Sequence, residues 1–174
     1  MRIACLALCG LLLAGAGAPT RVEVELGPDG TLRWDRGSTP FLVVPVRRGD
    51  GWLAVARRVC GSSAAAARLR EANAPLAQPL SDRPVRVPLE LVRSELRLRA
   101  VERLFAADRR VAEGWEHWVL DPFGGGEESR AWLAELFTGR GDGGGLLWGG
   151  GPEGSLRRGS RVVIPNSRLL PVFA

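Results

Sequence analysis

Residues 41–60 of the chain read FLVVPVRRGDGWLAVARRVC. Residues 41–46 are apolar and include β-branched residues, as in a short buried strand. Residues 47–51 hold two glycines and an aspartate, which favour a turn. The apolar residues that follow have the spacing of one helical face: Trp52, Val55, Ala56 and Val59. The stretch therefore predicts a strand, a turn and a short helix in close succession.

The next thirty or so positions add a second helix and a second strand. Gly61 ends the first helix, and Ser62 or Ser63 can cap the next one by accepting its free N–H groups. Residues 64–73 are rich in helix formers. Residues 84–88, PVRVP, have the pattern of a strand. The predicted order over residues 41–92 is strand, helix, helix, strand.

Two further segments flank this unit. In residues 19–40, two stretches alternate between apolar and polar residues on either side of the turn sequence GPDG, which predicts a β-hairpin. Residues 93–114 carry an apolar stripe with arginine and glutamate elsewhere, and we assign them to a connecting helix with a polar break over 108–114.

The order of elements recurs in residues 115–172. Four features of the two copies align at nearly the same offset, which indicates an internal repeat: Val55-Ala56 with Leu133-Ala134, Gly61 with Gly139, Leu69 with Leu147, and Val87-Pro88 with Ile164-Pro165. The second copy is degraded, because glycines over 142–148 make a poor helix where the second helix belongs.

These patterns resemble the LysM (lysin motif) module, with Gly49-Asp50, Val55-Ala56, Leu69, Asn73 and Val87-Pro88 on its pattern. The two-copy layout is also similar to the non-catalytic region of some bacterial N-acetylmuramoyl-L-alanine amidases. The resemblance implies an α+β fold of two βααβ modules, residues 41–92 and 115–172, joined by a helix and preceded by a hairpin.

The resemblance also implies non-catalytic binding of peptidoglycan or a related glycan that contains N-acetylglucosamine. The ligand-binding residues would lie in two loops: Gly49, Asp50, Gly51, Trp52, Asn73, Ala74, Pro75 and Leu76. It remains open at this point whether Asp50 only caps the helix and Trp52 only fills the core. The alternative function is a protein-interaction or structural domain that has lost the glycan. A cell-wall hydrolase is a further expected partner.

The N-terminus has the layout of a secretory signal peptide over residues 1–18. Arg2 is followed by an uncharged apolar run and by small residues, with cleavage favoured after Ala16 because Pro19 hinders it after Ala18. The run is short for a membrane span, although an uncleaved anchor is the alternative. The expected location is therefore extracytoplasmic, in the periplasm or cell envelope, with no transmembrane span after cleavage. Only Cys60 would remain in the exported chain.

The formal net charge is +5, and every basic residue is arginine. No arginine cluster is interleaved with aromatic residues, so we expect anionic wall polymers rather than nucleic acid as partners. Catalysis is not expected either, since the single histidine, His117, cannot assemble a zinc site, and no cofactor or metal is predicted. Cys60 with His117 is the one conceivable pair of nucleophile and base, but Cys60 ends an apolar helix face, which favours a buried, inert thiol. Glu127-Glu128 sits at a predicted helix start, where carboxylates are favoured.

Overall fold

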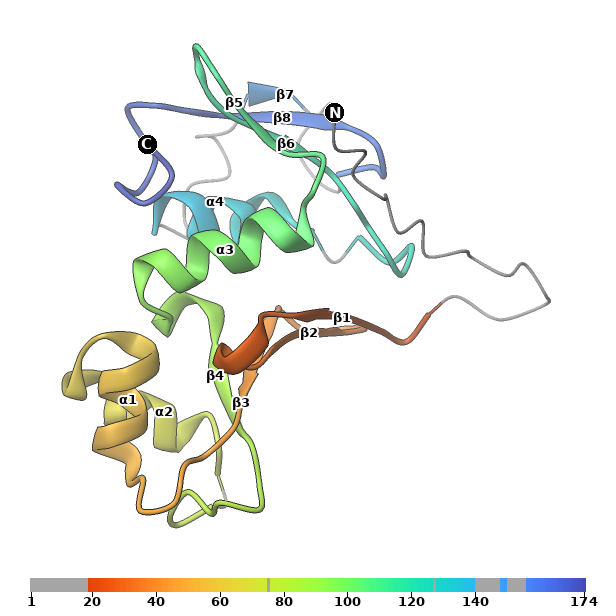
Figure 1. Ribbon diagram of the computed structural model, residues 1–174. Coiled ribbons are helices and arrows are strands. Elements are labelled where there is room, and N and C mark those ends of the chain that lie inside the picture. The colour runs from red at the N-terminus through yellow and green to blue at the C-terminus, as the bar shows by residue number, and fades with distance from the viewer. Residues whose placement is uncertain (1–18, 75, 127, 140–147, 150–155) are drawn as a thin grey trace, which may run out of the picture.

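The computed structural model describes residues 19–74, 76–126, 128–139, 148–149 and 156–174. Within these residues the chain forms four α-helices and two four-stranded antiparallel sheets, as Figure 1 shows. The expectation of an α+β fold is confirmed. We call residues 19–92 the first half of the molecule and residues 93–174 the second half.

The first sheet has the strand order β1-β2-β3-β4. Its strands are β1 (Arg21–Glu25), β2 (Thr31–Asp35), β3 (Phe41–Val44) and β4 (Val85–Pro88). β1 and β2 form the predicted hairpin, which extends the main sheet because β2 also pairs with β3, with Leu32 opposite Leu42. Gly30 at the turn has φ 110°, and a Cβ there would lie 2.2 Å from the carbonyl oxygen of Val43. The hairpin can approach β3 only because this residue is glycine.

Strand β1 lies at the free edge of this sheet, where charged side chains pair across to β2. Arg21 donates a hydrogen bond to Asp35 at 2.6 Å, and Arg33 lies 2.7 Å from Glu23. The residues of these pairs stand directly opposite each other in the strand register. Oppositely charged cross-strand pairs of this kind support a hairpin and fix its register.

Two helices connect β3 to β4: α1 (Trp52–Cys60) and α2 (Ala66–Glu71). Helix α1 buries Val55, Ala56 and Val59, as its sequence spacing predicts. It ends at Gly61, which adopts the left-handed conformation with φ 77°. Ser62 then caps the short 3-10 turn ahead of α2 by accepting a hydrogen bond from the Ala64 amide. β3 and β4 pair in antiparallel register, so residues 41–88 form one strand–helix–helix–strand unit.

The connecting helix α3 (Ser94–Leu104) ends slightly before the polar break that the sequence predicts over residues 108–114. The backbone leaves the helix at Phe105, whose ring enters the core with 3% of its surface exposed. Asp108 then turns inward, and Arg109–Val111 forms strand β5. The helix ends here because Phe105 and the side chain of Asp108 are buried. The polar residues 108–114 alone predicted only a break between two elements.

The second sheet has the order β5-β6-β8-β7. Its remaining elements are β6 (Gly114–Trp118), α4 (Arg130–Thr138), β7 (Trp148–Gly149) and β8 (Arg161–Pro165). Helix α4 begins after Ser129, whose hydroxyl accepts a hydrogen bond from the Trp132 amide, and ends at Gly139. Of the degraded second helix expected over 142–148, residues 142–147 lie outside the described residues, and Trp148 belongs to β7.

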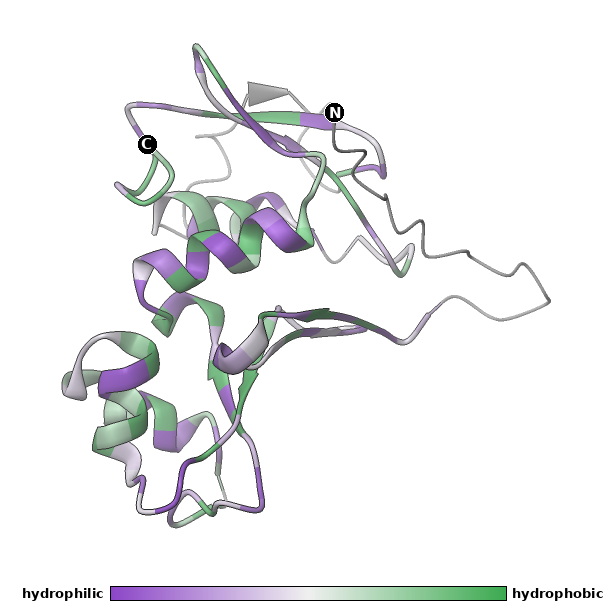
Figure 2. Ribbon diagram, in the orientation of Figure 1, coloured by the Kyte–Doolittle hydropathy of each residue, from purple (hydrophilic) through white to green (hydrophobic). Residues whose placement is uncertain are grey.

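The two halves share one hydrophobic core. Trp34 of β2 is 1% exposed, and its ring lies 5.6 Å from those of Phe123 and Trp132 and 6.3 Å from that of Phe105. Polar contacts reinforce the junction, since Arg99 of α3 pairs with Asp29 at 2.8 Å. Figure 2 shows hydrophobic and hydrophilic residues mixed around α3, which contacts both halves. In the part of the chain that the structure describes, no helix combines the length and apolar character needed to cross a membrane.

We predict that replacing Trp34 with alanine destabilises both halves together. Truncating a buried tryptophan removes the shared aromatic contacts and should lower the free energy of unfolding by about 3–5 kcal/mol. Urea denaturation followed by circular dichroism measures this change. Trp118→Ala is the matched control, because that side chain is 37% exposed and its loss should change stability by only about 0.5 kcal/mol. Separate unfolding transitions of the two halves in the wild type would contradict a shared core.

Candidate functional site

The two loops predicted to bind a ligand lie side by side in the first half. The loop over 45–51 joins β3 to α1, and the loop over 72–84 joins α2 to β4. The indole N–H of Trp52 donates a hydrogen bond of 3.0 Å to the carbonyl oxygen of Ala77, which connects the two loops directly. The Trp52 ring is half-buried against the core and is therefore partly available at the loop surface.

Asp50 closes the first loop on itself. Its carboxylate accepts hydrogen bonds from the Arg47 amide at 3.0 Å and from the Arg58 guanidinium at 2.7 Å. Burial alone would raise the pKa of Asp50, but these hydrogen bonds outweigh it and hold the pKa below its usual value. Asp50 does not cap α1, because the N-cap residue is Gly51 and no side chain bonds there. The turn also requires Gly49, which has φ 85°.

Asn73 is bonded internally and joins α2 to β4. Its side-chain amide donates to the carbonyl oxygens of Leu69 and Arg86, both at 2.7 Å, and its carbonyl oxygen accepts from the Arg86 amide at 2.7 Å. The residue is only 9% exposed. Both N–H groups of Asn73 are thus used within the fold, and this side chain shapes the loop without facing a ligand.

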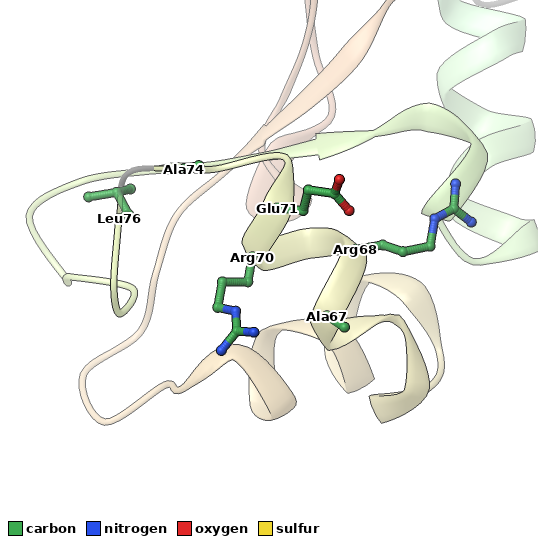
Figure 3. A pocket seen from close by; sticks show the side chains of 6 residues that line it. All are labelled: Ala67, Arg68, Arg70, Glu71, Ala74 and Leu76. Carbon is green, nitrogen blue, oxygen red and sulfur yellow. The ribbon is translucent and has the colours of Figure 1, made fainter.

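A shallow depression of about 510 Å³ lies beside the second loop. Figure 3 shows its lining residues: Ala67, Arg68, Arg70, Glu71, Ala74 and Leu76. Of the predicted site, the depression includes Ala74 and Leu76. Gly49, Asp50, Gly51, Trp52 and Asn73 do not line it, and Pro75 lies outside the described residues.

The sequence analysis missed the contribution of α2 to this depression. Ala67, Arg70, Glu71 and Ala74 are spaced as one face of a helix, and that face is exposed. The signal was therefore present as a polar and small-residue face opposite the buried Leu69. In Figure 3, the side chains of Arg70 and Arg68 extend in different directions from α2, and Glu71 lies between them.

The second half contains a buried cluster of charged side chains around His117. Its Nδ1 lies 2.9 Å from Asp108 and its Nε2 lies 2.9 Å from Glu128, and all three side chains are at most 1% exposed. Asp108 also accepts hydrogen bonds from the Trp115 indole and the Trp118 amide. The cluster therefore joins the end of α3, strand β6 and the residues before α4.

Glu128 is fully committed within this cluster. Its carboxylate accepts hydrogen bonds from the amides of Leu120 and Asp121, at 2.9 and 2.8 Å, in addition to its contact with the ring. Burial disfavours the charged ring of His117, but its hydrogen bonds to Asp108 and Glu128 outweigh this and raise the pKa of His117 to about 9. Below that pH the ring is an imidazolium between two carboxylates.

The polar groups of this cluster are bonded to one another and to the backbone. Both ring nitrogens of His117 are occupied, and the ring separates the two carboxylates, so these groups do not converge on a common point in space. Among the described residues, no group of three or more His, Cys, Asp or Glu side chains is placed to hold a metal ion. Glu127 lies outside those residues.

Cys60 is not paired with His117, because both ring nitrogens of His117 are bonded to carboxylates. The thiol ends α1 in a half-buried position, and burial raises the pKa of Cys60 to about 11. A thiol with this pKa is almost entirely protonated at neutral pH and is a poor nucleophile. This agrees with the interpretation of Cys60 as an inert residue.

The glycine-rich segment 121–126 is likewise folded onto itself. The Asp121 carboxylate accepts a hydrogen bond from the Gly126 amide at 3.0 Å, and Phe123 is buried in the aromatic cluster with Trp34. Arg36 donates a hydrogen bond to the carbonyl oxygen of Phe123. The segment thus joins the two halves.

Comparison of the chain with protein-family models, curated proteins and solved structures found no match.

We predict that Asn73→Ala destabilises the protein, because it leaves the backbone groups of Arg86 without their partners. An unsatisfied buried polar group costs about 1–3 kcal/mol, and urea denaturation measures this loss. Asn166→Ala is the matched control, since Asn166 is exposed and its amide donates one hydrogen bond, to the Ala112 carbonyl oxygen. Equal stability of the two variants would show that Asn73 does not hold α2 to β4.

We also predict that stability falls as the pH rises from about 6.5 to 9. A folded-state pKa raised from 6.5 to about 9 stabilises the fold fully below pH 6.5, and this contribution is lost as the pH passes the folded value. Its size is on the order of 3 kcal/mol. The chain has no lysine or tyrosine, so few other groups titrate in this window.

The measurement is the free energy of unfolding at several pH values for the wild type and for His117→Gln. The variant should be less stable at pH 6 and should lose most of the slope between about pH 6.5 and 8.5. Cys60→Ala controls for the thiol, which deprotonates in the unfolded chain at the upper end of the window. A slope that persists unchanged in His117→Gln would assign the pH dependence to another group.

Proposed function

We propose that this protein binds peptidoglycan or a related glycan containing N-acetylglucosamine, without catalysis, and that the first half carries the site. The observation that supports this most directly is the contact between Trp52 and Ala77, which holds the two loops of a strand–helix–helix–strand unit next to each other. The order and pairing of these elements agree with the module that the sequence resembles.

The chemistry of the neighbouring depression suits an uncharged sugar with N-acetyl groups. Ala67, Ala74 and Leu76 offer a small apolar floor for a methyl group, and charged side chains stand around it. Specific sites for small ligands combine such apolar contacts with a few polar groups. The internal hydrogen bonds of Asp50 and Asn73 support the proposal indirectly, since they hold the loops in place before a ligand arrives.

We propose a structural role for the second half. Its aromatic side chains pack against one another in the interior, with the ring of Phe137 lying 5.7 Å from that of Trp115 and 5.0 Å from that of Phe173. Its charged cluster around His117 is also buried. Because these aromatic and charged side chains are buried, we assign them a stabilising role in the fold.

The proposal places the protein outside the cytoplasm, exported by the apolar segment 1–18, which lies outside the described residues. The protein partner that we propose for this glycan-binding protein in that compartment is a cell-wall hydrolase. The competing proposal is a protein-interaction or structural domain that has lost glycan binding. Binding measurements distinguish the two proposals.

The test is retention of the purified protein on insoluble peptidoglycan and on chitin. Ala67→Trp fills the depression from the exposed face of α2 and should reduce retention by at least about tenfold, because it removes the contacts of the ligand there. Ala131→Trp places the same bulk on the exposed face of α4 and should leave retention unchanged.

Thermal melting of both variants separates lost binding from lost folding. If Ala67→Trp and the wild type are retained equally, the ligand does not bind in the depression. Failure of the wild type to bind either polymer would refute glycan binding and favour the protein-interaction alternative.

A further inference from the structure

The charge of the molecule is concentrated around the proposed site. Residues 41–92 contain eight arginines and four carboxylates, so they carry a formal charge of +4, compared with +5 for the whole chain. The binding unit is therefore strongly basic, whereas the rest of the protein is nearly neutral. A neutral sugar does not account for this distribution, since electrostatic complementarity reflects charge on the partner.

Many arginines in the chain are neutralised by neighbouring carboxylates. Arg58 pairs with Asp50, and Arg68 lies 3.6 Å from Glu90. Outside the binding unit, Arg109 and Arg161 both contact Glu116, at 2.7 and 3.0 Å. Arg58 and Arg68 are thus each balanced by a carboxylate, whereas Arg109 and Arg161 share one carboxylate and keep one positive charge between them.

Five arginines in the two loops and in helices α1 and α2 form no ion pair with a described residue, and Arg83 in the second loop is one of them. Arg47 and Arg48 lie in the loop before α1, Arg57 lies on α1 and Arg70 lies on α2. All five are exposed and none forms an ion pair with a described residue, although the charge of Arg47 also helps to lower the pKa of Asp50. We call this set the arginine rim. Arg70 itself lines the depression, and Figure 3 shows its guanidinium extending away from the α2 backbone beside that hollow.

We infer that the arginine rim binds the carboxylates of peptide stems attached to the glycan chain, while the depression takes the sugar. This inference rests on the function proposed above and specifies its ligand as the anionic, peptide-bearing polymer. Guanidinium groups bind carboxylates through paired hydrogen bonds, and they are the preferred cations for this purpose. Glu71 stands at the border of the depression and disfavours a carboxylate directly over it, so the anion is directed toward the rim.

The experiment compares three polymers: peptidoglycan freed of phosphate polymers by acid, the same material after its carboxylates have been converted to neutral amides, and chitin. The full chain should be retained about tenfold more strongly on the first polymer than on the other two, given that exposed charges each add a modest gain. Retention should also fall between about 0.01 M and 1 M salt, over which the Debye length shortens from about 30 to 3 Å.

Variants with reversed charge identify which arginines bind the anionic polymer. Arg47→Glu combined with Arg48→Glu should lower retention on the anionic polymer about tenfold and leave binding to chitin unchanged. The control variant is Arg157→Glu combined with Arg158→Glu, which alters an exposed adjacent pair in the second half. It changes the net charge by the same amount as the variant at Arg47 and Arg48. It should stay within about twofold of the wild type. Arg47→Gln with Arg48→Gln removes charge without adding any and should give an intermediate loss.

Equal retention on the amidated and unamidated polymers, or equal losses in both reversal variants, would overturn the arginine rim while leaving glycan binding in place. Retention only on walls that still carry phosphate polymers would assign the rim to phosphate and refute the carboxylate. Absence of binding to any peptidoglycan or to chitin would refute the proposed function itself.

Discussion

The ring of His117 lies between two carboxylates, 2.9 Å from each, in a position from which solvent is excluded. A buried charge is stable only when it is paired and hydrogen-bonded, and here the backbone supplies the remaining donors. Asp108 follows α3, and Glu128 precedes α4, so both helices are held to the second sheet through one side chain. Helix α3 in turn supports the first half, because Arg99 reaches Asp29 and the Phe105 ring contacts Trp34. The ion cluster therefore holds α3 and α4 to the second sheet, and through α3 it also supports the first half.

The sequence predicted the elements that depend on local patterns. Turn residues at 27–30, the helical spacing in α1 and the cap at Ser62 are all set by neighbours within a few positions, and the structure agrees with them. Contacts between distant residues were not predictable in this way. Asp108 and Glu128 lie on opposite sides of His117 in the chain, and nothing in their local sequence shows that they meet the same ring.

The candidate site shows the same limit. Asn73 was predicted as a ligand-binding residue because it lies on the pattern of the module that the sequence resembles, yet its partner is the backbone of Arg86, thirteen positions further along. That contact depends on the pairing of β4 with β3, which sequence periodicity does not fix. Conversely, Arg70 was not among the predicted site residues, and its position beside the depression becomes evident only when α2 is placed next to the loop.

The charged hairpin has a consequence for how the protein can be assembled with others. An exposed strand offers unpaired N–H and C=O groups to any extended peptide, which is a common route to aggregation. In strand β1, Arg21 and Glu23 alternate with valines and are already paired with Asp35 and Arg33 of β2. Another chain approaching this edge would have to break those pairs and bury their charges. Copies of the molecule can thus come close together at this edge with little tendency for neighbouring sheets to pair.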